Sequence, residues 1–119
     1  MKLDEYITAH LERPFVWGEN DCILFAVNWI NLQTGHDYLA GFPHWSNARQ
    51  ALRLVQSIGG LEAAFDRRLL RIEAGMARDG DLGLVGRVAC IFSGSRVVAP
   101  AAFGLAFTDR TKSCAAWHY

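Results

Sequence analysis

Residues 14–29 read PFVWGENDCILFAVNW, a turn-forming stretch that runs into the start of an apolar segment. Asn20 and Asp21 are residue types that cap helices, because their side chains accept hydrogen bonds from the unpaired N–H groups of a first turn. The continuation to residue 34 is apolar on nearly every side, which is typical of a buried helix, and Gly35 ends it. The sequence therefore predicts a central helix that begins at Cys22.

Helical patterns also flank this central segment. Residues 3–12 carry apolar side chains at helical spacing and stop before Pro14, and residues 36–45 have the composition of a loop. Ser46 is the predicted cap of a third helix that the Gly59-Gly60 pair terminates. Residues 61–70 predict one more short helix. The first part of the chain, residues 1–72, is thus expected to be helical.

The pattern changes to short β-rich runs after Gly80. Five strands are predicted, at residues 81–85, 88–92, 96–99, 105–108 and 114–118. Helices that precede a series of short strands indicate an α+β fold with the apolar helix packed on one face of an antiparallel sheet. We expect one domain over residues 1–119, with its β part at 80–119.

Composition excludes several classes of function. Twelve basic and twelve acidic residues cancel, so no electrostatic field would gather nucleic acid. The three cysteines lack the paired spacing of a zinc site, and we expect no metal or other cofactor. No stretch reaches the roughly 18 apolar residues of a membrane span, and the N-terminal residues do not resemble a secretory signal. Synthesis in a bacterial cytoplasm is the corresponding expectation.

Cys22 is the residue with the clearest chemical potential. A helix N-terminus favours a thiolate, because unpaired N–H groups and the helix dipole stabilise negative charge, so this position is expected to lower the pKa of the thiol. The same N–H groups are suited to stabilise an oxyanion on an attacked substrate. The alternative is a small buried hydrophobic residue in the first turn of a core helix.

The segment around Cys22 resembles the active-site entry of the NlpC-like cell-wall cysteine peptidases, which have a papain-type fold. More narrowly, it is similar to a small branch of that superfamily encoded among the tail genes of phages and prophages. The resemblance extends to RQALRLVQSIGGLEAAFDRRL (49–69), ARDGDLGLV (77–85), VACIFSGSRVVAP (88–100) and AAWHY (115–119). It implies that Cys22 matches the nucleophile and Asp21 its acidic neighbour, while Trp17 and Gly18 match the turn beside the substrate groove.

The resemblance fails at the general base. The family's histidine corresponds to Arg87 or Val88 here, and its orienting polar residue corresponds to a position near Ala99. An arginine cannot accept a proton, although Arg87 in the groove would favour a thiolate electrostatically.

Four histidines remain as sources of a base. His10 is expected on the surface of the first helix and His36 in a loop, which leaves His44 and His118 as candidates for a displaced base. Aromatic side chains in the loop, Phe42 and Trp45, are the predicted interface residues, because aromatic anchors are enriched at interfaces.

Two functions follow from the resemblance. The first is a structural domain of a phage tail tip or tail-assembly complex, located in the virion and bound to other tail proteins, with a degenerate catalytic site. The second is an active cysteine peptidase or amidase that cleaves cell-wall peptides during phage entry. A third interpretation, a hydrolase or toxin unconnected with phage, stays open because fold does not fix function.

Overall fold

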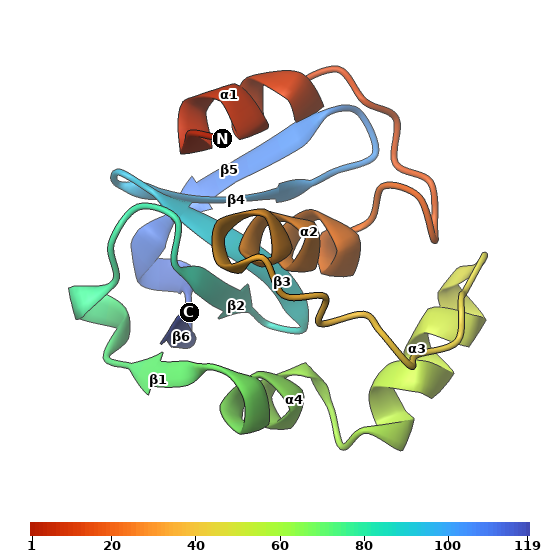
Figure 1. Cartoon of the computed structure of the whole chain (residues 1–119). Helices are drawn as coiled ribbons and strands as arrows, with labels where there is room; N and C mark the ends of the chain where they lie inside the picture. Colours follow the sequence, from red (N-terminus) through yellow and green to blue (C-terminus); the bar gives the residue numbers. More distant parts are fainter.

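The computed structural model describes residues 1–119 and confirms an α+β fold (Figure 1). The helices are α1 (Leu3–His10), α2 (Cys22–Thr34), α3 (Ala48–Ser57), α4 (Leu61–Arg68) and the short 3-10 helices η1 (Ala74–Met76) and η2 (Arg110–Lys112). The strands are β1 (Leu70–Ile72), β2 (Leu82–Val85), β3 (Val88–Ser93), β4 (Arg96–Pro100), β5 (Leu105–Asp109) and β6 (Ala115–His118). They form one antiparallel sheet in the order β1-β6-β2-β3-β4-β5.

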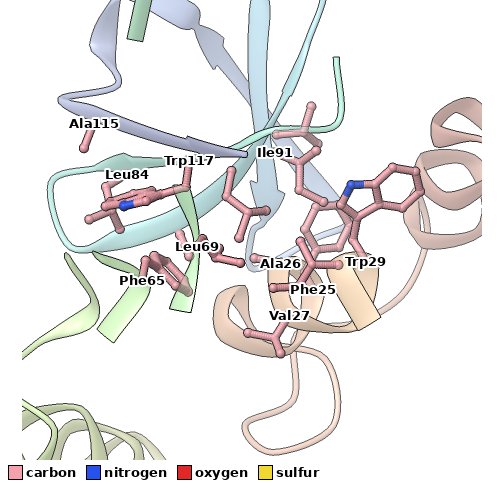
Figure 2. Packing of buried hydrophobic residues seen from close by; sticks show 14 of the residues in the cluster. Phe25, Ala26, Val27, Trp29, Phe65, Leu69, Leu84, Ile91, Ala115 and Trp117 are labelled. Carbon is pink, nitrogen blue, oxygen red and sulfur yellow. The ribbon is translucent and has the colours of Figure 1, made fainter. Parts of the chain in front are cut away.

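One face of the sheet carries the main core. α2 packs on β3 and β4, and α4 packs on β1 and β6 (Figure 1). Alternation along the strands directs every second side chain to this face, where Ile91 meets α2 and Trp117 meets Phe65 of α4. Figure 2 shows these two groups at opposite ends of the same cluster. α2 is therefore the central buried helix that its apolar composition predicts.

Buried polar atoms of this core are paired. The indole N–H of Trp29 donates to the carbonyl of Gly80 at 2.8 Å, and the hydroxyl of Tyr6 donates to the carbonyl of Phe25 at 2.6 Å. The indole of Trp117, which is fully buried, donates to Asp66 at 2.9 Å. Each bond offsets the desolvation of a group that burial would otherwise leave unpaired.

The opposite face of the sheet carries a second, smaller core. It consists of Ala77, Cys90, Phe92, Val97, Ala99 and Ala116. The guanidinium of Arg110 lies 5.1 Å from the centre of the Phe92 ring and donates to the carbonyl of Ala77 at 2.7 Å. A long cationic side chain thus covers apolar surface while its head satisfies a backbone carbonyl.

The five predicted strands are confirmed to within one residue at each end, and the sheet gains a sixth strand. That strand, β1, lies inside the segment 1–72 that was predicted to be helical. Its three residues give no periodic signal of their own, and they become a strand by pairing with β6. The cap of α3 is Asn47, which accepts from the Gln50 N–H at 2.9 Å, and not the predicted Ser46.

The predicted surface location of His10 is wrong. His10 is buried against Tyr6 and Phe25, and its Nδ1 lies 2.7 Å from the Tyr6 carbonyl. An amphipathic pattern over a single short helix does not reveal how far its apolar face extends around the helix.

None of the helices has both the length and the apolar composition that a membrane-spanning segment requires.

Substitution of Gly83 by alanine tests the packing between β2 and the second core. A Cβ at this position would lie 2.5 Å from Ser113 Oγ and 2.8 Å from Phe92 Cε2. We expect Gly83→Ala to lower the free energy of unfolding by about 1–3 kcal/mol, measured by urea denaturation. Gly75→Ala, which meets no atom within 4 Å, is the matched control and should be nearly neutral. Equal stability of both variants would contradict the packing described.

A second prediction concerns His10 and pH. Burial, and to a smaller extent the charge of Arg13, lower the pKa of His10, while the bond to Tyr6 acts against them. The unfolded chain therefore binds the proton at a higher pH than the folded chain, so stability falls as pH drops below about 6.5. His10→Asn should flatten this dependence in urea titrations at several pH values. His36→Asn, at an exposed site, should leave it unchanged.

Candidate functional site

Cys22 lines a cleft with a volume of about 600 Å³. The cleft lies between the N-terminal end of α2, helices α3 and α4, and the β2–β3 turn. Its polar lining comes from Cys22, Gln56, Glu62, Arg87 and Cys114, and Trp17 contributes an aromatic wall. The structure therefore brings together three of the predicted site residues, Trp17, Cys22 and Arg87, from distant parts of the sequence.

Asp21 fixes the geometry of this end of α2. It is fully buried, and its carboxylate accepts from the N–H groups of Leu24 and Gly18, each at 2.9 Å, and from the indole of Trp45 at 2.7 Å. The first bond is the N-cap that the sequence predicts. The carboxylate of Asp21 therefore caps α2 and also tethers the turn at Gly18 and the loop at Trp45 to the start of that helix.

Gly18 is required by the same arrangement. Its φ of 80° is left-handed, and a Cβ there would lie 1.8 Å from the carbonyl oxygen of Trp45. The turn before Cys22 and the loop before α3 are thus packed backbone against backbone. Trp45, predicted as an interface residue, is 5% exposed and belongs to this contact, which corrects that prediction.

The thiol of Cys22 is half-buried, and its pKa differs from the sequence expectation. Burial raises the pKa above its usual value, and the adjacent Asp21 carboxylate raises it further. Hydrogen bonding by the backbone of Ala89, Cys22 and Ile23 lowers it, but to a smaller extent than burial raises it. The expectation of a depressed pKa is therefore wrong, because desolvation of the sulfur outweighs the stabilisation by backbone N–H groups.

The strand residue beside the sulfur is Ala89 of β3. Ala89 is fully buried and faces α2 together with Ile91 and Val98. Val88 and Ala99 are each adjacent along the strand to one of these residues, so their side chains point to the opposite face of the sheet, where Ala99 belongs to the second core. The side chains of β3 and β4 that face α2 are therefore apolar and include no proton acceptor.

No histidine lines the cleft. His118 lies 2.6 Å through Nδ1 from the buried carboxylate of Asp81, one residue beyond Trp117 and hence on the other face of the sheet. His44 is exposed and its ring approaches Gly18, behind the turn. The structure places both candidates for a displaced base outside the cavity that holds the thiol.

Phe42 occupies a separate position. It lines an apolar crevice of about 60 Å³ between α2, α3 and α4, and the guanidinium of Arg68 lies 5.3 Å from its ring centre. Phe42 is half-buried, so only part of this predicted interface residue is accessible.

Sequence reasoning missed several residues of the cleft. Gln56 lies on α3, Glu62 lies on α4 and Cys114 directly precedes β6, and no local pattern links them to Cys22. The position of Ala89, in contrast, follows from the alternation of side chains along β3. Once one residue of the strand is known to face α2, every second residue is expected to face it too.

The chain belongs to a family described as a domain of unknown function, DUF6950, whose model matches residues 1–119. No curated protein matches the chain. No solved structure matches it either.

The tether made by Asp21 predicts a large effect on stability. Asp21→Ala leaves two backbone N–H groups and a buried indole without their acceptor, so we expect a loss of about 3 kcal/mol or more in the free energy of unfolding. Asp21→Asn keeps an acceptor oxygen and should lose less. Urea denaturation followed by tryptophan fluorescence measures both variants. Equal and small losses would show that the carboxylate is not the tether.

Proposed function

We propose that this protein is a structural component of a phage tail, built on an NlpC-like, papain-type scaffold that no longer hydrolyses peptide bonds. The observation that carries the proposal is the apolar surface that β3 and β4 present to α2, together with a cleft around Cys22 that contains no histidine. The cleft remains, and in this proposal it receives a segment of a neighbouring tail protein without cleaving it. The protein is then made in the bacterial cytoplasm and incorporated into the virion.

The chemical argument rests on proton transfer. An acyl transfer by a thiol requires a base that takes its proton and later returns one to the leaving amine. The side chains of Ala89, Ile91 and Val98 can do neither, and the guanidinium of Arg87 offers only N–H donors and no acceptor. A thiol whose pKa is raised by burial finds no histidine in the cleft that would offset its low reactivity, and the one carboxylate that lines the cleft, that of Glu62, is paired with Arg71.

The architecture supports the NlpC-like part of the proposal. α2 begins at the cysteine, it packs on an antiparallel sheet, and the turn before it is locked by a glycine and an aspartate. These are the features that the resemblance of residues 14–29 implies. The tail-associated role comes from the resemblance to the phage-encoded branch, and genes adjacent to the one for this chain would support it if they encode tail proteins.

One observation favours the second candidate, an active peptidase or amidase. The sulfur lies at the N-terminal end of α2, where the backbone of Ala89 and Ile23 acts to lower the pKa of the thiol, and N–H groups in such a position would also stabilise an oxyanion. This function needs an imidazole from a neighbouring chain at the open side of the cleft. It therefore predicts activity only in the assembled tail.

The rate of alkylation by iodoacetamide distinguishes an unreactive thiol from an activated one. Cys114 is exposed and lines the same cleft, so it is an internal reference in the same molecule. We expect Cys22 to react about tenfold more slowly than Cys114 near neutral pH, because its pKa is raised and it is half-buried. Peptide mass spectrometry at several reaction times gives both rates. Faster labelling of Cys22 than of Cys114 would overturn the proposal.

Phage carrying Cys22→Ala provide the biological test. If the domain is structural, the variant assembles normal tails and infects as well as the parent, since alanine is tolerated at a small half-buried site. Cys90→Ala is a control for general effects of removing a buried thiol. Normal tails that fail to infect would indicate that Cys22 acts chemically during entry.

A further inference from the structure

β5 leaves one edge of its backbone without a partner. It is the last strand of the sheet and pairs only with β4. No hydrogen bond from outside the sheet reaches the backbone of Leu105 to Thr108. The segment after α1 covers the strand only at its start, where Pro14 pairs with Phe103 and the carbonyl of Leu11 closes on Gly104.

Pro100 determines which backbone groups point outward. Pro100 lies opposite Leu105, and because proline has no N–H this pair cannot be a hydrogen-bonded one. In an antiparallel ladder hydrogen-bonded and non-hydrogen-bonded pairs alternate. The N–H and C=O groups of Leu105, Phe107 and Asp109 therefore point away from β4, toward the free edge.

Large apolar side chains lie along this free edge. Phe103 is 95% exposed, and Phe107 and Leu11 are 45% and 44% exposed. Leu11 lies near Phe103, because the carbonyl of Leu11 closes on Gly104, the next residue along the chain. Exposed aromatic side chains beside unpaired strand groups are the features of an interface, because the rings gain by leaving water and the strand groups are free to pair with another strand.

The two edges of the sheet differ in their protection. β1, at the other end, has three residues and carries the charged Arg71 at its centre, an arrangement that discourages edge pairing. β5 has no charge, proline or bulge between Leu105 and Thr108. Only the edge at β5 is open to another strand.

We propose that β5 pairs antiparallel with β5 of a second copy of this chain, which gives a two-fold symmetric dimer with a sheet continuous across both copies. A pairing centred on Phe107 is the one that uses all three outward-pointing residues. Phe107 then faces its own copy, and Leu105 faces Asp109 in both directions. Each of these three pairs exchanges two backbone hydrogen bonds.

Charge supports a second copy as the occupant. In this register Asp109, the one charged residue of β5, meets the apolar Leu105 of the other copy and not a second carboxylate. No like charges meet, although the strand pairs with itself. The symmetric contact also closes, so it gives a dimer and not a filament. The dimer is independent of the cleft, which lies over the other half of the sheet, beside β2 and β6.

Analytical ultracentrifugation of the whole chain over a wide range of concentrations tests the proposal. The unmodified chain should form dimers, and Phe107→Glu or Phe107→Lys should each weaken dimerisation by about tenfold or more, since like charges then lie directly opposite each other. A mixture of the two variants should regain dimers, because the introduced glutamate of one copy then faces the introduced lysine of the other. Leu70→Glu, on the exposed and protected edge strand, is the control and should not change association.

The mixing experiment separates loss of the interface from loss of the fold, since a misfolded variant cannot be rescued by its counterpart. A chain that stays monomeric at all concentrations would overturn the proposal. Dimers that persist in both single variants would also overturn it, because the contact would then lie elsewhere. Failure of the mixture to associate would refute the pairing centred on Phe107.

Discussion

The buried carboxylate of Asp21 is the contact on which the rest of the site depends. Three N–H donors converge on it, from the turn before α2, from the first turn of α2 itself and from the loop that leads to α3. Because the carboxylate is desolvated, each donor is held firmly, and the three segments cannot move independently. The position of Cys22 and one border of the cleft follow from this single side chain.

Strand alternation decides the chemistry around Cys22. Side chains one residue apart on β3 and β4 belong to opposite cores, so the residues that face α2 are Ala89, Ile91 and Val98. The same rule turns His118 away from the cleft, where it pairs with Asp81 instead. A helix start that would favour a thiolate in water is therefore combined with an apolar surrounding that disfavours one.

This combination connects the proposed loss of catalysis with the proposed use of the domain in assembly. A scaffold that keeps its cleft and its rigid turn, but lacks a base, retains shape without reactivity. The free edge of β5 adds a second surface at the other end of the sheet. A protein that is held by several neighbours needs such separate surfaces, because each contact must be formed without blocking the others.

The sequence by itself determined the elements whose signals are local. The cap at Asp21, the apolar run of α2, the glycines that end helices and the five longer strands all follow from a few adjacent residues. Tertiary structure alone decided what lies next to what. β1 is a strand because β6 pairs with it, Trp45 is tethered in the interior because Asp21 accepts its N–H, and the pKa of Cys22 is raised because burial desolvates the sulfur. The reason is physical, since pairing, burial and desolvation are properties of residues distant in sequence, and no local pattern encodes which distant residue will arrive.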